Sequence, residues 1–237
     1  MITNKLIFDT LLSDIKCQKL KRVVIGLNWV LVQGESGCGL ASTPSKDNSS
    51  CTTISNAGKL TKLNLINASE LVYSNNPIEV SIGMASINAF YNRYDFVAKN
   101  KNGLDTFSRI DGPITIVGRF PQISKRYKNV KVIEKKPRKG EYGEKDAAKL
   151  FRNSEGVVIT SSTLLNGTAG KLIELAKNTR ICLVGPSTPF ASKLLDLGIE
   201  CLAGTIVTDV KKMIISVSEG GDAKALKPYG SFKVLTR

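Results

Sequence analysis

The sequence predicts an α/β protein whose C-terminal half forms a Rossmann-like, doubly wound and mainly parallel sheet, preceded by a smaller α+β domain. One observation is a set of short, nearly all-apolar runs. A second is the helix-length spacing between them. Continuous apolar strands that alternate with helices are typical of a parallel sheet covered on both faces. The five runs are "ITIVG", "VKVIE", "GVVIT", "RICLVG" and "ECLAGTIV".

The N-terminal half has a different pattern. Residues 4–16 carry apolar residues at helical spacing, which predicts an amphipathic helix. The run "KRVVIGLNWVLVQ" and the turn-rich "GESGCGLASTPS" predict a strand, a glycine turn and a second strand. Residues 45–53 are polar and rich in Ser and Asn, which predicts a surface loop.

Two helices are expected between residues 68 and 94, divided at "SNNP" so that Pro77 opens the second. That second helix contains several small residues, including Gly83 and Ala85, which allow close packing. Periodicity disappears between residues 98 and 113, where Gly, Asn and charged residues dominate. We therefore expect one domain at residues 1–105 and a second at residues 106–237.

Composition indicates where the protein works. No run approaches the roughly 18 consecutive apolar residues of a membrane span, and the first 16 residues carry lysine and aspartate where a signal peptide has its apolar centre. The five cysteines form an odd number without a C-x-x-C pair, which argues against a disulfide framework and a zinc ribbon. These features predict a cytoplasmic protein without a membrane partner.

The chain contains no histidine. This absence excludes Ser-His and Cys-His nucleophile pairs, imidazole acid–base chemistry and histidine metal ligands. Cys38 lies in a glycine turn near Glu35, so these two residues are candidates for a thiolate or metal-ligand role. Cys182 and Cys201 fall inside apolar strand runs, where cysteine is usually a small buried hydrophobic residue.

The formal net charge of +14 favours an anionic partner such as a nucleotide, a phosphate or a nucleic acid. Half of this excess lies between residues 125 and 139. A solvated loop is the ordinary explanation of such a run, and an anion funnel or a nucleic-acid footprint is the alternative. Few aromatic residues are interleaved, so stacking on single strands is not favoured. The cations are Lys125, Arg126, Lys128, Lys131, Lys135, Lys136, Arg138 and Lys139.

Polar turns follow two of the predicted strands. In an open parallel sheet, ligands bind beyond the carboxyl ends of the strands, where helix N-termini present free N–H groups. The segment "VVITSSTLLNGTAGKLIELAK" passes from strand to helix through such a turn, and "RICLVGPSTPF" repeats the design. The same residue types also cap helices that bind nothing. The candidate ligand-binding residues here are Thr160, Ser161, Asn166, Gly167, Thr168, Gly185, Pro186, Ser187 and Thr188.

The first two strands of the sheet add further candidates. Gly118 and Phe120 follow the first strand, and Glu134 ends the second, where a dinucleotide fold binds ribose hydroxyls. The first turn reads "GRFP" rather than G-x-G-x-x-G, so it lacks the glycines that admit a pyrophosphate. NAD is therefore not favoured, whereas another polar, ring-bearing ligand stays open.

The motifs "VGRFP", "VIEKKP", "VVITSSTLLNGT", "LVGPSTP", "LAGTIVTD" and "SEGG" occur in the order found in the heavy-metal chelation family, whose members are of otherwise unknown function. The resemblance covers residues 113–228. The preceding "GLASTP" and "GMASINAFYN" resemble that family's small domain, which has an enolase N-terminal-like fold. The resemblance implies a site in the cleft between the domains, adds Gly204 to the candidates, and suggests a metal, metal-bearing or heterocyclic ligand.

We therefore expect a small anionic, heterocyclic or metal-associated ligand in an interdomain cleft, with Lys135 or Lys136 attracting the anion. A soft-metal cage is hard to assemble from scattered cysteines without histidine, so a bound ion needs oxygen ligands, Cys38, an organic chelator or a second subunit in a homodimer. One alternative is an enzyme of small-molecule or cofactor metabolism that uses Glu35 or Glu134 as its acid–base group. Another is nucleic-acid binding through residues 125–139.

Overall fold

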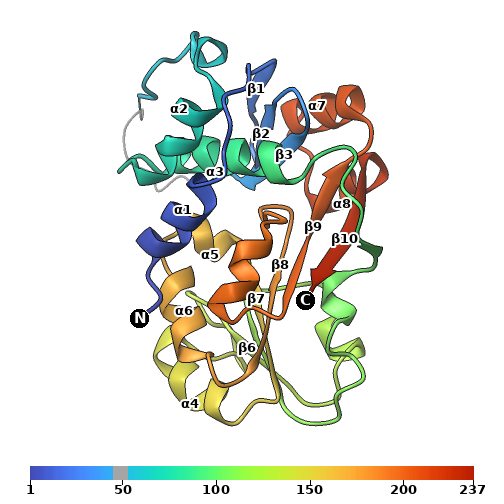
Figure 1. The fold of residues 1–237 in the computed structure, drawn as a ribbon. Helices are drawn as coiled ribbons and strands as arrows, with labels where there is room; N and C mark the ends of the chain where they lie inside the picture. Colours follow the sequence, from blue (N-terminus) through green and yellow to red (C-terminus); the bar gives the residue numbers. More distant parts are fainter. Residues whose placement is uncertain (45–52) are drawn as a thin grey trace.

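The computed structural model describes residues 1–44 and 53–237 and has the predicted α/β architecture (Figure 1). A seven-stranded, mainly parallel sheet forms the C-terminal domain, and a smaller N-terminal domain contains a three-stranded antiparallel sheet. Of the loop expected at residues 45–53, residues 45–52 lie outside the described residues, and these include Cys51.

The N-terminal sheet has three strands where the sequence predicted two. The long apolar run is itself a hairpin, since the N–H of Gly26 donates to the carbonyl oxygen of Trp29 at 2.9 Å and reverses the chain. The segment "CGLAS" follows the glycine turn and forms the third strand. The spatial order is β1 (Arg22–Ile25), β2 (Trp29–Gln33) and β3 (Cys38–Ser42), with both pairs antiparallel.

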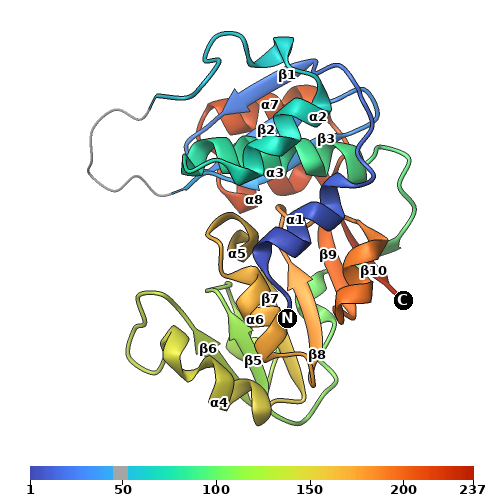
Figure 2. The same cartoon turned by 60° about the vertical axis from the view of Figure 1, so that its left-hand side comes forward.

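Helices cover both faces of this small sheet (Figure 2). α3 (Pro77–Tyr91) lies on one face, and α7 (Val210–Ser218) from the C-terminal domain lies on the other. Pro77 opens α3 as predicted, and the side chain of Asn76 caps it by accepting from the N–H of Ile78. A Cβ on Gly39 would stand 2.0 Å from the carbonyl oxygen of Ala85, so only glycine lets β3 lie this close to α3. The other helices here are α1 (Asn4–Leu12), α2 (Leu65–Ser69) and the 3-10 helices η1 (Leu60–Lys62) and η2 (Glu70–Tyr73).

All five predicted strands of the C-terminal half are present and form one parallel block. Two antiparallel strands extend the sheet at one edge, of which β10 pairs with β9 along seven residues. The spatial order is β4 (Lys99–Asn100), β10 (Gly230–Thr236), β9 (Cys201–Val207), β8 (Arg180–Val184), β7 (Gly156–Thr160), β5 (Ile114–Val117) and β6 (Val130–Ile133).

The connections of this sheet reverse direction between β5 and β7. β5 continues to β6 over one face through the 3-10 helix η4 (Ile123–Lys125), whereas β7 continues to β8 over the other face through α5 (Ser162–Leu165) and α6 (Ala169–Leu175). Such a switch point opens a crevice at the carboxyl ends of the two strands. The remaining elements are η3 (Gly103–Asp105), η5 (Glu144–Asp146), α4 (Ala147–Arg152), η6 (Ser192–Leu197), α8 (Ala223–Leu226) and η7 (Lys227–Tyr229).

Buried polar contacts join the two domains. Asn92, at the end of α3, donates through Nδ2 to the carbonyl oxygen of Thr188 and accepts through Oδ1 from the N–H of Phe190, each at 3.0 Å. At the start of α6, the N–H of Gly170 donates to Oδ1 of Asn4 on α1 at 2.7 Å. Within residues 1–44 and 53–237, no helix combines the length and the apolar character that a membrane crossing requires.

Candidate functional site

A cavity of about 310 Å³ lies at the switch point of the C-terminal sheet. Its walls are the residues that follow β5, β6 and β7, as expected where the connections of neighbouring parallel strands diverge. Gly118 has a φ of +101°, and a Cβ there would stand 2.7 Å from Cγ2 of Thr160. The lining residues are Val117, Gly118, Arg119, Ile133, Glu134, Lys135, Glu144, Thr160, Ser162, Thr163, Asn166, Thr168 and Leu172.

A second cavity, of about 790 Å³, adjoins the first and lies between the two domains. The N-terminal domain contributes residues after β3 and at the start of α3, and the C-terminal domain contributes the turn after β7. Lys135, Ser162 and Asn166 line both cavities. We refer to the two adjoining cavities together as the groove. The second is lined by Asn4, Phe8, Ser42, Thr43, Pro44, Val72, Ser74, Asn75, Pro77, Val80, Ser81, Lys135, Ser162, Leu164, Leu165, Asn166 and Gly167.

Hydroxyl groups connect the two walls of the groove. The hydroxyls of Thr160 and Ser42 each donate to Oγ of Ser162, at 3.5 Å and 3.4 Å. Ser42 is the last residue of β3, and its carbonyl oxygen accepts from Oγ of Ser81 on α3 at 2.9 Å. Because hydroxyl groups both donate and accept, these side chains can reorient to suit a polar ligand.

The amide of Asn166 is fixed by its own turn. Its Oδ1 accepts from the hydroxyl of Thr168 at 2.7 Å and from the N–H of Thr168 at 3.2 Å. Asn166 is exposed and Thr168 is half-buried at the start of α6. With Oδ1 engaged, the Nδ2 group of Asn166 is the part of this side chain that can donate to a ligand.

Charged groups of both signs stand around the smaller cavity. Arg119 makes a bidentate pair with Glu141, with nitrogen–oxygen distances of 2.9 and 2.6 Å. The hydrogen bond from Arg119 lowers the pKa of Glu141 to about 2, so this pair is mutually satisfied. Within the described residues, no ion pair engages Lys135, Glu134 or Glu144.

The structure brings six of the sequence-predicted ligand residues to the groove. Gly118, Glu134, Thr160, Asn166 and Thr168 line the smaller cavity, and Gly167 lines the larger one. The other seven line neither cavity: these are Phe120, Ser161, Gly185, Pro186, Ser187, Thr188 and Gly204.

These seven residues serve packing roles or lie beside the groove. Ser187 and Thr188 are buried beneath the N-terminal domain, where Ser187 accepts from the backbone of Ser42 and Thr188 from Asn92. Gly204 lies within β9, where a Cβ would stand 2.8 Å from the carbonyl oxygen of Thr188. Phe120 packs against the apolar cluster on the opposite face of the sheet.

The Cys38 and Glu35 pair does not have the geometry expected of a metal site. Cys38 is the first residue of β3 rather than part of a turn, with 1% of its surface exposed, and it packs with Leu31 and Met213. Burial raises the pKa of its thiol to about 12, which disfavours the thiolate that binds metals. Across residues 1–44 and 53–237, no group of three or more Cys, Asp or Glu side chains is placed to hold a metal ion.

The basic segment is partly neutralised by neighbours. Arg126 pairs with Asp105, and Lys128 pairs with Asp111 at 2.7 Å. Lys135 lines the groove. The segment is therefore not one free cationic surface, and its sequence-based link to nucleic acid stays a prediction.

Sequence reasoning placed the ligand between the domains but named no ligand-binding residue in the wall of the groove that the N-terminal domain supplies. The sequence "STP" begins with Ser42, the last residue of β3, and continues with Thr43 and Pro44. It is a polar strand end of the same kind as the one at β7. Glu144 and Arg119 were also missed. Glu144 reaches the cavity through tertiary structure, because it lies in η5, between β6 and α4.

Comparison with known families supports the resemblance seen in the sequence. One family model matches residues 104–236 and a second matches residues 8–91, and both are described as "Putative heavy-metal chelation". The first of these ranges covers more than half of the chain. The chain belongs to the heavy-metal chelation family. No curated protein matches it significantly.

Solved structures of the heavy-metal chelation family share the fold. A family protein of unknown function from Desulfitobacterium hafniense is 25% identical, with 98% of each chain covered and a TM-score of 0.85. A second protein of unknown function, from Pyrococcus horikoshii, is 22% identical over 99% of this chain and 98% of that chain, with a TM-score of 0.77. At that lower identity the likeness concerns the fold alone. Both matches extend over the two domains together.

Proposed function

We propose that this member of the heavy-metal chelation family binds a small anionic molecule in the groove between its domains. One observation carries the proposal: two adjoining cavities, one at the switch point and one between the domains, share Lys135, Ser162 and Asn166. Shared polar residues at the junction favour one ligand that spans both cavities. Their combined size suits a ligand of ordinary metabolite dimensions.

Each polar group at the junction has a distinct role in this proposal. The ammonium group of Lys135 attracts and pairs with the anionic part of the ligand. The Nδ2 group of Asn166 and the hydroxyl of Ser162 donate hydrogen bonds to its oxygen atoms. Glu134 and Glu144 accept from hydroxyl or amine groups, because both line the smaller cavity without an ion-pair partner in the described residues.

A metal ion fits this site when it is already coordinated by the ligand. Two carboxylates, from Glu134 and Glu144, line the smaller cavity, and a set of three donors is absent from the described residues. Two oxygen donors leave most of an ion's coordination sphere to be filled. We therefore propose that a metal, when present, arrives with an organic chelator that supplies the remaining ligands.

The test uses a fractionated cell extract as the source of the unidentified ligand. Protein freed of small molecules by dialysis is mixed with a deproteinised cell extract fractionated on an anion exchanger, and its melting temperature is measured. A retained, anionic fraction is expected to raise the melting temperature of the wild-type protein, since a ligand that binds the folded state stabilises it. The same fraction is expected to leave Lys135→Ala unshifted.

Lys139→Ala is the matched control, because Lys139 is an exposed cation of the same segment that lines neither cavity. It should respond like the wild type. Equal shifts in Lys135→Ala and the wild type would place the ligand elsewhere, and the absence of any stabilising fraction would contradict anion binding.

A further inference from the structure

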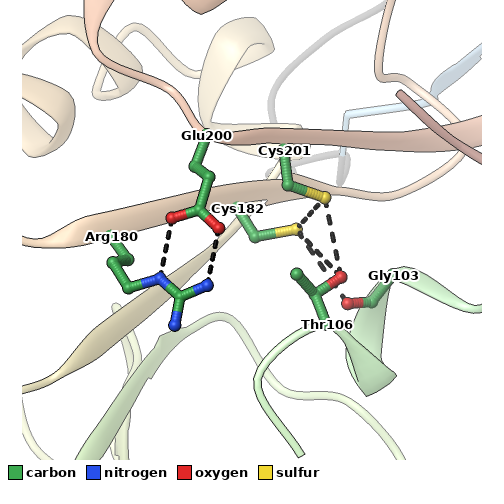
Figure 3. A network of polar contacts seen from close by, with 6 residues as sticks. All are labelled: Gly103, Thr106, Arg180, Cys182, Glu200 and Cys201. Carbon is green, nitrogen blue, oxygen red and sulfur yellow. Dashed lines mark hydrogen bonds and ion pairs between the residues drawn. The ribbon is translucent and has the colours of Figure 1, made fainter. Parts of the chain in front are cut away.

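Cys182 and Cys201 form a buried pair of thiols in the C-terminal sheet (Figure 3). Neither residue lines the groove. They are register partners on the neighbouring parallel strands β8 and β9, so their side chains point to the same face of the sheet. Their Sγ atoms lie 2.8 Å apart, and neither residue exposes any surface. The thiol of Cys182 donates toward the sulfur of Cys201.

The surroundings of the pair are apolar, with two oxygen atoms on one side. Oγ1 of Thr106 lies 3.5 Å from Sγ of Cys201 and 3.7 Å from Sγ of Cys182. The carbonyl oxygen of Gly103, in η3, accepts from Cys182 at 3.9 Å. Figure 3 shows both oxygens on the same side of the thiols. The apolar neighbours in this cluster include Leu104, Phe107, Ile116, Val184, Ala203 and Val234.

The nearest charged groups in Figure 3 neutralise each other. Arg180 donates to both carboxylate oxygens of Glu200, at 2.8 and 2.7 Å, and its guanidinium stands 5.1 Å from the centre of the Phe107 ring. This ion pair therefore offers no free carboxylate to a cation at the thiols. Any ion held there relies on sulfur.

We propose that Cys182 and Cys201 are a two-thiolate site for a soft, thiophilic d10 cation, with Hg(II) as the best match and Cu(I) as the second. The donor set decides the class of ion. Thiolates select soft metals, whereas a structural zinc site needs four ligands. The described residues bring no third Cys, Asp or Glu to this position. The ion must therefore be one that forms stable complexes with only two sulfur ligands.

Charge favours the divalent ion. Binding of Hg(II) replaces one proton on each thiol, so that one Hg(II) and two thiols give a neutral dithiolate complex and two protons released to solvent. The corresponding Cu(I) complex carries one negative charge. Because an apolar cluster penalises charge, the neutral complex suits these surroundings better.

Burial and hydrogen bonding act differently on the two thiols. Burial raises the pKa of Cys182 well above its usual range. The hydrogen bond from Cys182 lowers the pKa of Cys201, and Thr106 adds to this effect.

Room for the ion comes from movement of the short segment above the thiols. A metal–sulfur bond is about 2.3 Å long. Two sulfur atoms on opposite sides of one ion therefore lie farther apart than the present Sγ–Sγ distance of 2.8 Å, so the thiols must turn apart. The residues that cover them, Gly103 and Thr106, belong to η3 and its C-terminal end rather than to a strand. Binding is therefore expected to displace η3 and leave the sheet intact.

The experiment titrates the full chain in the Cys17→Ser/Cys51→Ser background, which removes the exposed thiol and the thiol outside the described residues. Reduced protein receives Hg(II), and the ultraviolet sulfur-to-metal charge-transfer band and the protons released are recorded. We expect the protein to bind one equivalent of Hg(II) and to release two protons. Cu(I) is expected to compete for the same site, and Zn(II) is expected not to bind. Cys182→Ser and Cys201→Ser should each abolish the stoichiometric band.

Two further variants keep the outcome decisive. Cys38→Ala, in the same background, should bind as the parent does, because Cys38 lies in a different apolar cluster. Should a serine variant fail to fold, Cys182→Val retains an apolar side chain and tests the same loss. Binding that survives loss of either cysteine, a folded parent that binds no Hg(II), or oxidation of the pair to a disulfide in place of binding would overturn the proposal. Lys135→Ala should leave Hg(II) binding unchanged, which separates this site from the groove.

Discussion

The backbone N–H of Ser42 donates a hydrogen bond of 3.0 Å to Oγ of Ser187, across the contact between the two domains. Ser42 ends β3 of the N-terminal domain, and Ser187 is buried in the turn after β8. A turn with the composition of a ligand site is thus used to hold the other domain. The contact also fixes Ser42, which lines the groove.

Replacement of Ser187 by Ala should weaken this domain contact. The N–H of Ser42 would lose its acceptor in this part-buried contact, and the loss of one such hydrogen bond costs about 0.5–1.5 kcal/mol. Urea unfolding of Ser187→Ala should therefore show a free energy of unfolding lower by that amount. Ser108→Ala is the control, because the hydroxyl of Ser108 bonds the carbonyl oxygen of Asp105 at the exposed surface; it should change stability by less than about 0.5 kcal/mol. Equal losses in the two variants would mean that the contact does not hold the domains.

Gly118→Ala should damage both stability and ligand binding. The residue has a left-handed φ of +101°, and a methyl group would stand 2.7 Å from Cγ2 of Thr160, a groove residue. Strain of this kind costs about 1–3 kcal/mol. Thermal and urea unfolding measure the loss.

Gly140→Ala separates the effect of backbone strain from the effect of the close contact with Thr160. Gly140 has a similar φ of +87°, but a Cβ there meets nothing within 4 Å. It should lose stability through backbone strain alone and keep the response to the anionic fraction. If Gly118→Ala behaves the same way as Gly140→Ala, close contact with Thr160 does not shape the cavity.

The pair formed by Arg119 and Glu141 predicts a pH response. Glu141 has a pKa of about 2 in the folded protein, against an ordinary value of 4.5, chiefly because Arg119 donates to it. A lowered carboxyl pKa stabilises the fold above pH 4.5, and this contribution disappears as the pH falls toward 2. In Arg119→Gln, the pKa of Glu141 should return toward 4.5, as measured by carbon-13 NMR titration of the carboxyl group. An unchanged pKa would mean that backbone donors alone hold the carboxylate.

Thiol labelling tests the burial of Cys38. Because its pKa is raised to about 12, little thiolate exists at pH 8, and the side chain is also covered. In the Cys17→Ser/Cys51→Ser protein, a disulfide reagent at pH 8 should leave Cys38 unmodified until denaturant is added. Rapid labelling of the native protein at Cys38, located by peptide mass, would contradict this burial and would restore Cys38 as a metal-ligand candidate.

The central strands of the fold were accessible to sequence reasoning because they are buried on both faces. β7 and β9, for example, are continuous apolar runs. β10 was missed, since most of its residues are only half-buried and its pairing with β9 is antiparallel. The division of the first apolar run into β1 and β2 was also missed, because the run stays apolar on both sides of the turn between Gly26 and Trp29.

The groove could be predicted in part because the carboxyl ends of parallel strands meet at one edge of the sheet. Thr160 ends β7, Glu134 directly follows β6, and Asn166 lies in the turn between α5 and α6. The parallel topology brings these strand ends and their turns to one edge. Ser42 reaches the same place only through packing of the N-terminal domain, which local pattern does not reveal. Ser187 has the same chemistry as a ligand-binding serine, and only its burial and its contact with Ser42 distinguish the structural use.

The most direct test of the central claim is native mass spectrometry of gently purified protein, with elemental analysis of the same sample. If the groove binds an anionic molecule, the wild-type protein should carry one non-protein mass per chain, with any metal present in proportion to it. The Lys135→Ala/Asn166→Ala protein should appear at its bare mass. A bare wild-type mass without metal, or an adduct that the double variant retains, would contradict the account.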